Sequence, residues 1–492
     1  MFDRPHDSAV LERDDDADLV DATAVRELRR LPLPPAPPPL PRASTPRPVR
    51  PRPLESPRPR GLYVPVTFKF AFAFVLSAAW MTLSIVLSLP WLHDLEALVG
   101  LPVAIFAIAG IAILPGMMNA FLVASLLVDR RPPRRPLIDY PGITILVAAY
   151  NEAASIADTL RSIEQQQYPG PFEVVVIDDG STDATAAIVA SHPRPWLRLL
   201  RQPRNLGKTA ALNRGLAESS HDYVVTLDGD SYLYRDALQR LVERYFSDPP
   251  TTRAVAGTVL VRNSRRNWVT RTQEWDYFHG ISAIKRVQSL FQGTMVAQGA
   301  FSMYERAALA TVGGWQPCVG EDIVLTWALL ERGWRVGHAE DACCFTNVPD
   351  NVRQFVRQRQ RWSRGMMEAF RRHPRVLLTP RLSTLFVWWN VLFPWLDLAY
   401  TLFFIPGLVL ACFGIFWVVG PLTLALLPMA LLVNYVMYRI GTRMFASQGL
   451  QIRRNPLGFA VYAFAYSLIL QPASVAGHFS ELLGLRKTWG SK

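Results

Sequence analysis

The sequence predicts an α/β domain inserted between transmembrane helices. Long runs without a charged residue flank a central block, and within that block short β-rich runs alternate with helix-like segments. The composition agrees, because only 19% of the 492 residues are charged, whereas soluble domains usually carry about 25%. This balance excludes a mainly disordered or collagen-like chain.

Residues 1–62 are expected to form a disordered cytosolic tail rich in proline and arginine. Prolines crowd residues 31–60, and such sequence favours an extended, solvated chain that cannot bury a core. No apolar run near the start has the form of a signal peptide. A solvated spacer is the expected role of this tail, and a partner-binding segment is the alternative.

Residues 63–136 are expected to hold two transmembrane helices. Phe70–Leu89 and Ala97–Val128 contain no charged residue, and about 20 apolar residues suffice to cross a bilayer. The connection between them is acidic, whereas both outer flanks carry arginine or lysine. The positive-inside rule therefore places the tail and the block after Val128 in the cytosol.

Residues 137–350 are expected to fold as the α/β domain. Ile143–Ala148, Glu173–Ile177 and Tyr223–Leu227 have the composition of buried strands, and helix-like segments separate them. Strands that alternate with helices favour a mostly parallel sheet. Ligands of such sheets bind beyond the carboxyl ends of the strands, which is where acidic clusters follow the second and third runs.

The C-terminal part is expected to return to the membrane. Residues 351–382 mix arginines with aromatic residues, which is typical of a helix on an anionic bilayer surface, so most of these arginines are expected to bind lipid. Residues 383–492 are expected to contain an interface helix and about three transmembrane helices, five spans in all. Basic residues after the last apolar run conflict with the positive-inside rule, so the topology of this end stays open.

The net charge of +12 is compatible with binding to nucleic acid, anionic lipid or a polyanionic substrate. The basic residues cluster beside the apolar runs, where a lipid bilayer explains them, and no nucleic-acid-binding module is recognisable. The four cysteines contain no C-x-x-C pair. They are therefore interpreted as ordinary thiols facing a reducing compartment rather than as a disulfide scaffold or metal site.

Asp228-Gly229-Asp230 directly follows the predicted strand Tyr223–Leu227. Two carboxylates at this spacing can hold a divalent cation that bridges a diphosphate, because magnesium and manganese prefer hard oxygen ligands. Taken alone, the motif is more typical of an Asp- and Gly-rich turn.

Two further motifs stand at the starts of helix-like runs. Gly207-Lys208 precedes Thr209–Ser219, and a lysine beside a helix N-terminus suits a phosphate, although a solvated lysine is the alternative. Gly320-Glu321-Asp322 precedes Ile323–Glu331. Asp322 is interpreted as a general base whose acidic neighbour shifts one of the two pKa values, with a helix N-cap as the alternative.

The pentapeptide Gln358-Arg359-Gln360-Arg361-Trp362 lies in the arginine-rich segment. A tryptophan flanked by glutamine and arginine can stack on a sugar ring while the arginine binds phosphate.

These motifs occur in a fixed order between the apolar runs. In chain order they are Tyr150-Asn151-Glu152, Asp178-Asp179-Gly180-Ser181, Gly207-Lys208, Asp228-Gly229-Asp230, Gly320-Glu321-Asp322 and Gln358…Arg361-Trp362. The set resembles the processive family-two glycosyltransferases, the synthases of cellulose, chitin, hyaluronan and poly-N-acetylglucosamine. The Q-x-x-R-W pentapeptide after an E-D pair is its most specific element, and the resemblance covers about residues 140–375.

The resemblance implies a cytosolic, Rossmann-like GT-A domain that binds a UDP-sugar donor. Tyr150, Glu152 and Asp179 match the positions that contact uridine. Lys208 and Asp228 match those near the ribose and the diphosphate.

The resemblance also implies a metal and a base. Asp230 matches the firmest metal ligand and Asp228 its support, so Mg²⁺ or Mn²⁺ is the expected cofactor. Asp322 matches the general base that takes the proton from the acceptor hydroxyl. Attack from the face opposite the departing UDP would invert the anomeric carbon and give a β-linkage.

The acceptor site implied by the resemblance is on the pentapeptide. Gln358 and Trp362 match residues that bind the acceptor sugar, and Arg361 matches one beside the diphosphate. The stretch Glu274–Gln288 looks most like the poly-N-acetylglucosamine synthases, so UDP-N-acetylglucosamine is the favoured donor. Gln298 departs from the serine or cysteine common in relatives, which bears on the acceptor pocket.

The expected protein is thus a multi-pass inner-membrane enzyme, inverting and processive, that extends a polysaccharide acceptor. Coupling of this synthesis to export of the polymer is a further hypothesis. Transfer of a single sugar to a lipid carrier is one alternative. A catalytically silent scaffold of an export complex is another, and accessory export subunits are conceivable partners.

Overall fold

The computed structural model describes residues 51, 53–54, 64–420, 427–446 and 453–485, which all belong to one compact unit. The predicted tail therefore lies almost entirely outside the described residues. Its end is an exception: Pro53 pairs with Leu137 in an antiparallel bridge, and the Leu54 N–H donates to the Pro136 carbonyl at 2.9 Å. This end of the tail thus runs along the linker that leads into the α/β domain.

Three helical stretches among the described residues are long and apolar enough to cross a membrane: Val66–Val99, Leu101–Leu127 and Thr384–Cys412. Pro456–Phe464 and Tyr466–Leu482, bent by 51° at their junction, make a fourth if the pair is one span. The first two stretches coincide with the predicted runs. Five spans remain a prediction, since residues 421–426 and 447–452 lie outside the described part.

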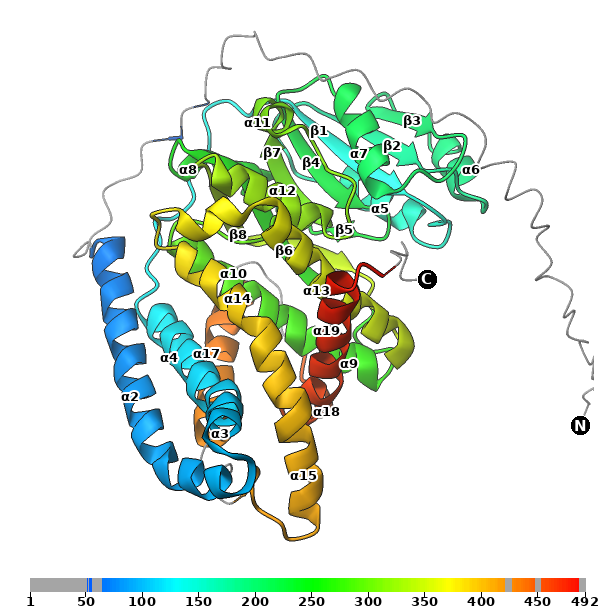
Figure 1. The fold of residues 1–492 in the computed structure, drawn as a ribbon. Coiled ribbons are helices and arrows are strands. Elements are labelled where there is room, and N and C mark those ends of the chain that lie inside the picture. The colour runs from blue at the N-terminus through cyan, green and yellow to red at the C-terminus, as the bar shows by residue number, and fades with distance from the viewer. Residues whose placement is uncertain (1–50, 52, 55–63, 421–426, 447–452, 486–492) are drawn as a thin grey trace, which may run out of the picture. The chain divides into compact units, whose positions relative to one another are not determined.

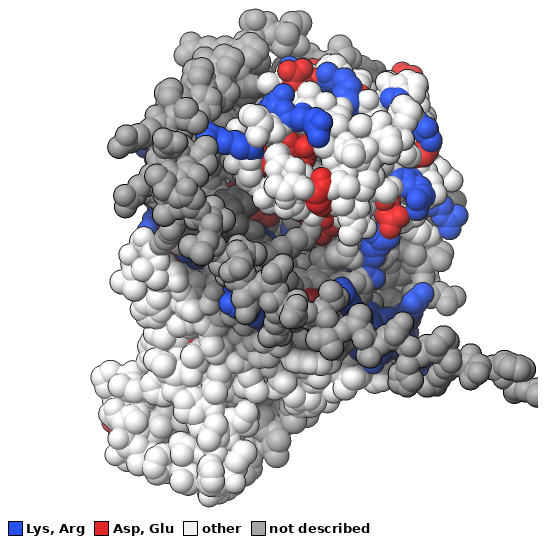
Figure 2. All heavy atoms as spheres, turned by 90° about the vertical axis from the view of Figure 1, so that its right-hand side faces the viewer, with Lys and Arg blue, Asp and Glu red and all other residues white. Residues whose placement is uncertain are grey.

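These helices bear the labels of Figure 1. The N-terminal set is α2 (Val66–Val99), α3 (Leu101–Ile108), η1 (Ala109–Ile113) and α4 (Leu114–Leu127); the C-terminal set is α14 (Thr384–Ala399), η4 (Tyr400–Phe404), α15 (Ile405–Cys412), α17 (Leu427–Ala446), α18 (Pro456–Phe464) and α19 (Tyr466–Leu482). On the face drawn in Figure 2, charged side chains are concentrated in the upper part, and the lower part is nearly without them. Such a surface suits contact with lipid.

The α/β domain is built on an eight-stranded sheet of order β3-β2-β1-β4-β7-β6-β8-β5. Its strands are β1 (Ile143–Ala149), β2 (Phe172–Asp178), β3 (Leu197–Arg201), β4 (Tyr223–Asp228), β5 (Tyr232–Leu233), β6 (Thr252–Val261), β7 (Phe301–Glu305) and β8 (Arg335–Thr346). The predicted strands correspond to β1, β2 and β4. The predicted mostly parallel sheet is confirmed, since β3-β2-β1-β4 and the pair β6–β8 are parallel. The sequence analysis did not foresee β7, which runs antiparallel to both β4 and β6, or β5, which runs antiparallel to β8.

Helices cover the sheet and lead to the membrane segments (Figure 1). They are α5 (Ile156–Glu164), α6 (Thr185–Ala190), α7 (Lys208–Ala217), α8 (Ala237–Ser247), α9 (Trp268–Trp275), η2 (Asp276–Ile281), α10 (Ser282–Leu290), α11 (Arg306–Val312), α12 (Glu321–Glu331), α13 (Val352–Arg372) and η3 (Pro374–Leu378). Helix α7 approaches the sheet closely at Gly215, where a Cβ would lie 2.7 Å from Ile177 and 3.0 Å from Leu146. This contact places Lys208, the first residue of α7, at the carboxyl edge of the strands.

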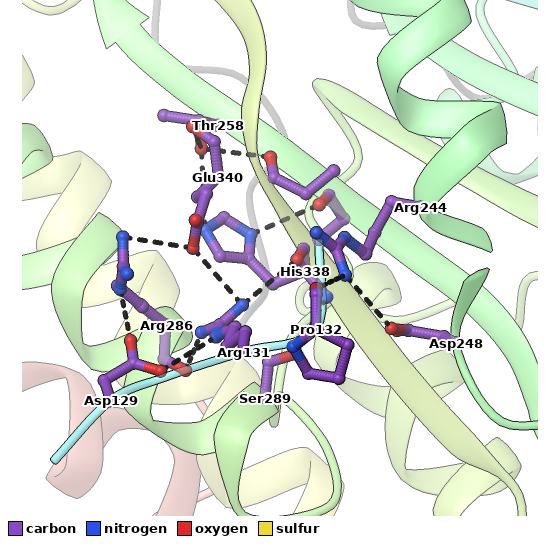
Figure 3. Close-up of polar contacts among 12 residues, drawn as sticks. Asp129, Arg131, Pro132, Arg244, Asp248, Thr258, Arg286, Ser289, His338 and Glu340 are labelled. Carbon is purple, nitrogen blue, oxygen red and sulfur yellow. Dashed lines mark hydrogen bonds and ion pairs between the residues drawn. The ribbon is translucent and has the colours of Figure 1, made fainter. Parts of the chain in front are cut away.

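The linker after α4 is fixed to the α/β domain by a partly buried group of charges (Figure 3). Arg131 and Arg286 both pair with Glu340, at 3.3 and 3.2 Å, and both also pair with Asp129. Arg131 in addition donates to the main-chain carbonyl of Arg286. Since two cations face two anions, the charges compensate one another, and the second span is joined to α10 through side chains as well as through the chain.

Candidate active site

The loop after β2 provides the first wall of the site. Asp179 is buried, and its carboxylate accepts from Gln202 Nε2 and from the backbone N–H groups of Leu206 and Gly207 at 2.8–2.9 Å. Burial raises the pKa of this carboxyl, while the two backbone donors act in the opposite direction. Asp179 thus holds the loop that delivers Lys208 to the site.

Tyr150 and Glu152 follow β1 directly. The Tyr150 side chain is exposed, which leaves its ring open to a ligand. Glu152 accepts from Ser155 Oγ at 2.7 Å and lies beside the turn after β4, since a Cβ at Gly229 would be 3.2 Å from Glu152 Cγ. The structure therefore brings the predicted uridine residues to the edge that also carries Asp228.

Lys208 joins two elements that are far apart in the sequence. Its Nζ lies 2.5 Å from Asp228 Oδ1 after β4 and 3.5 Å from Glu321 Oε1 on α12. Burial alone would lower the pKa of Lys208, but the carboxylates of Asp228 and Glu321 raise it, so the ammonium stays charged. Gly299 makes room for it, because a Cβ there would lie 2.9 Å from Nζ.

Asp228 and Asp230 are the candidate ligands of a cation. Thr346 Oγ1 donates to Asp230 Oδ1 at 3.1 Å, and both aspartates keep partial exposure. Within the described residues no group of three or more His, Cys, Asp or Glu side chains could hold a metal ion. Two carboxylates fit a metal that takes its other ligands from a diphosphate and water, as Mg²⁺ usually does.

The candidate base stands in the first turn of α12. The helix begins at Glu321 with Gly320 as its N-cap, so the alternative of Asp322 as an N-cap is wrong. Asp322 Oδ1 accepts from the Ile323 N–H at 2.8 Å. Burial raises the pKa of Glu321 to about 7, opposed by Lys208 and reinforced by Asp322, so Glu321 holds a proton more readily than an ordinary glutamate.

Helix α13 fixes the start of α12. The buried carboxylate of Glu368 accepts from the N–H groups of Val319 and Gly320 at 2.8 and 3.1 Å. The two segments touch through glycine, since a Cβ on Gly320 would lie 2.4 Å from Gly365 Cα. The base-bearing helix and the pentapeptide helix are therefore one packed unit.

The pentapeptide residues differ in their surroundings. Gln358 is buried, and its Oε1 has no hydrogen-bond partner among the described residues, which suits a hydroxyl donor from a ligand. Arg361 is partly exposed and acts electrostatically on Glu321. Trp362 is 39% exposed, so part of its ring is open for stacking.

Several arginines of α13 bind protein groups, a role different from the predicted contact with lipid. Arg364 and Arg371 pair with Glu481 on α19 at 3.3 and 2.9 Å. Arg372 donates to the Pro317 carbonyl at 3.1 Å. Helix α13 is thus held between α12 and α19, which explains why its charges are used internally.

Sequence reasoning missed two buried charges of this helix, Glu368 and Arg359. Glu368 is the only acidic residue between Arg353 and Arg375, and this isolation was a usable signal. Arg359 was indistinguishable by sequence from its neighbouring arginines. The structure brings the site residues that the sequence analysis did predict to one edge of the sheet and to the helices α12 and α13.

Known glycosyltransferases are similar to this chain in sequence and in fold. Residues 144–313 match the sequence profile of glycosyl transferase family 2. The chain is 34% identical over 234 residues to a poly-beta-1,6-N-acetyl-D-glucosamine synthase of Staphylococcus aureus, a match that covers 47% of this chain and 56% of that protein. The corresponding protein of Staphylococcus epidermidis is 33% identical over 233 residues, with the same coverage.

A solved structure supports the fold. A mannosyltransferase from Pyrobaculum calidifontis, in complex with GDP-Man and Mn²⁺, superimposes with a TM-score of 0.51 at 20% identity, covering 80% of this chain and 99% of that one. The curated relatives are matched over only about half of their length, so their whole activity does not follow from the match alone.

Proposed function

We propose that the protein is an inverting, processive β-glycosyltransferase, because residues 144–313 match the family model of glycosyl transferase family 2 and the fold resembles that of a solved glycosyltransferase. The protein extends a polysaccharide from a UDP-sugar, with UDP-N-acetylglucosamine as the favoured donor. The observation that carries this proposal is the junction of Lys208 with Asp228 and Glu321, directly beside Asp322. The ammonium of Lys208, the candidate metal ligands Asp228 and Asp230 and the candidate base Asp322 thus lie near one edge of the sheet.

The donor side neutralises the charge of the diphosphate. Tyr150, Glu152 and Asp179 would contact the uridine, while Lys208 and Arg361 would offset the negative charge that grows on the departing UDP. A divalent ion, Mg²⁺ or Mn²⁺, held by Asp228 and Asp230 would supply further charge neutralisation there.

The acceptor side supplies the nucleophile. The acceptor sugar stacks on Trp362 and donates a hydroxyl hydrogen bond to Gln358 Oε1. Asp322 takes the proton of the attacking hydroxyl as its oxygen forms a bond to the anomeric carbon. The bond from that carbon to the diphosphate oxygen breaks, UDP leaves with the electron pair, and attack from the opposite face inverts the carbon.

The membrane segments support a location in the cell membrane. Three or four candidate spans stand before and after the catalytic block, and their basic flanks favour a cytosolic catalytic domain. A cytosolic site is where nucleotide sugars would be met, and the spans would offer the growing polymer a route out.

The test is UDP release from purified membranes given Mg²⁺ or Mn²⁺ and each common UDP-sugar separately, with product size read on the same samples. Release with one donor and a product of high mass is the expected result. A chloroform-soluble product with one sugar per lipid would establish transfer to a lipid carrier instead. No release with any donor would contradict the proposal and favour a silent scaffold.

A further inference from the structure

Arg359 differs from the other arginines near it on α13. It is only 5% exposed, whereas Arg357, two residues earlier, is exposed and Arg361 is partly exposed. A buried guanidinium keeps its charge, so its desolvation must be offset by partners. The partners of Arg359 therefore indicate what holds it in the interior.

The charge of Arg359 is compensated from the α/β domain. Its Nη2 lies 2.8 Å from Asp276 Oδ2, and Asp276 is the first residue of η2. Asp276 is itself buried, and a Cβ on Gly280, one turn further, would lie 2.8 Å from its other oxygen. The ion pair is thus enclosed, which makes it stronger than a pair at the surface.

Aromatic rings surround the rest of the guanidinium. Its Cζ lies 4.2 Å from the ring centroid of Trp362, 4.9 Å from that of Phe355 and 5.9 Å from that of Tyr466. Its Nε has no hydrogen-bond partner among the described residues. Contact with ring faces is therefore the main replacement for the water that Arg359 loses.

The Trp362 ring is consequently covered on one face, while another part of it stays accessible. Arg359 lies over one face, and the ring centroid of Tyr277 lies 6.4 Å away, yet 39% of the residue stays exposed. A ring whose orientation is fixed before binding loses little conformational freedom when a sugar stacks on it.

We propose that Arg359 is the positioning residue that holds Trp362 as the stacking platform for the terminal acceptor sugar, and that it thereby sets how long the growing glycan is retained. This inference rests on the proposed function. Tyr466 opens α19 at the 51° bend of the candidate span, so Arg359 also links the platform to the membrane helices.

Loss of the Arg359 contacts is expected to affect acceptor binding and not donor binding. Arg359 contacts neither Lys208, Asp228 nor Asp322 among the interactions of the described residues, so donor binding is not expected to depend on it. A loosely held Trp362 would weaken acceptor binding between additions, and the product would dissociate earlier.

The test compares Arg359→Lys and Asp276→Asn with Arg357→Lys as the matched control. Lysine keeps the charge at position 359 but lacks the planar group that stacks and pairs. Steady-state UDP release would be measured against the concentration of the active donor and of N-acetylglucosamine oligosaccharides. Oligosaccharide affinity without donor, UDP affinity and the length of the product would be measured on the same proteins, after thermal unfolding in detergent has established that each is folded.

We expect both variants to raise the acceptor KM about 10-fold, to weaken oligosaccharide binding to a similar degree and to shorten the product, with an unchanged donor KM and an unchanged Arg357→Lys control. Wild-type acceptor KM and product length in both variants would overturn the inference. So would parallel loss of UDP binding in both, which would assign the pair a purely structural role. A wild-type protein that neither releases UDP nor binds oligosaccharide would instead contradict the proposed function.

Discussion

The candidate site has two sides, a strand side that holds Lys208 and Asp228 and a helix side on α13 that holds Arg359 and Trp362. The two sides compensate their charges differently. On the strand side, Lys208 stands between Asp228 and Glu321, and these partners lie on separate elements that converge at the carboxyl edge of the sheet. On the helix side, Arg359 is paired with a single carboxylate and otherwise enclosed by rings. Ion pairing organises the first side, and stacking organises the second.

This difference matches what each side is proposed to bind. A diphosphate is a concentrated charge, so a preformed set of charged groups suits it. A sugar is neutral and presents a ring face and hydroxyl groups, for which an aromatic surface and an amide oxygen are better partners. Disturbing one side should therefore leave the other side's ligand largely unaffected.

Asp230→Asn should have the largest effect, on sugar transfer and on metal-dependent UDP binding at the strand side. Loss of one of two carboxylates available to a metal is expected to lower transfer by at least about 100-fold and to weaken metal-dependent UDP binding. Oligosaccharide affinity should stay at the wild-type value. Metal titrations followed by UDP release measure the first effect and calorimetry the second, with Asp222→Asn, an exposed carboxylate before β4, as the control.

Glu368→Gln should show whether the two sides act together. The amide oxygen can still accept both hydrogen bonds, but the negative charge beside the Val319 and Gly320 N–H groups is lost and the bonds are weaker, so the start of α12 is expected to shift. We expect kcat to fall about 10-fold through displacement of Asp322, with UDP affinity unchanged. Glu331→Gln at the opposite end of α12 is the control, and an unchanged kcat in Glu368→Gln would contradict the coupling.

Lys285→Met should have the smallest effect on catalysis and a visible one on stability. Lys285 is buried on α10 and donates to the Val296 carbonyl at 2.5 Å, and burial lowers its pKa from 10.5 to about 7 while Asp322 opposes the shift. The unfolded chain therefore binds more protons than the folded chain between about pH 7 and 10.5. The free energy of unfolding of the wild-type protein should therefore increase as the pH rises across that window. The destabilisation that comes from burying a charged lysine should be at its full value below pH 7.

Thermal unfolding in detergent from pH 6 to 9.5 measures this contribution. Methionine at position 285 should raise the melting temperature most at pH 6 and flatten the rise toward alkaline pH. Parallel curves for the two proteins would contradict a depressed pKa at Lys285.

The sequence was sufficient for the strand side because its information is local. β1, β2 and β4 are continuous apolar runs, and the residues that follow them must lie together once the strands are parallel. Asp179, Asp228 and Asp230 could therefore be placed at one edge of the sheet without coordinates.

The helix side could not be derived in the same way. The pairing of Arg359 with Asp276, and of Glu368 with the backbone before α12, joins residues about 50 to 80 positions apart. No local pattern distinguishes a buried arginine from a solvated one on an amphipathic helix. The antiparallel insertion of β7 was missed for a related reason, since strand direction is set by the connections and not by composition.

The most direct test of the account is Asp322→Asn, measured for UDP binding and for transfer on the same preparation. Asparagine keeps the shape of the side chain and can still accept from the Ile323 N–H, but it cannot take a proton. The account predicts UDP affinity close to the wild-type value and a loss of transfer of about 100- to 10,000-fold. An Asp322→Asn protein that transfers sugar at the wild-type rate would contradict the assignment of the base and, with it, the proposed site.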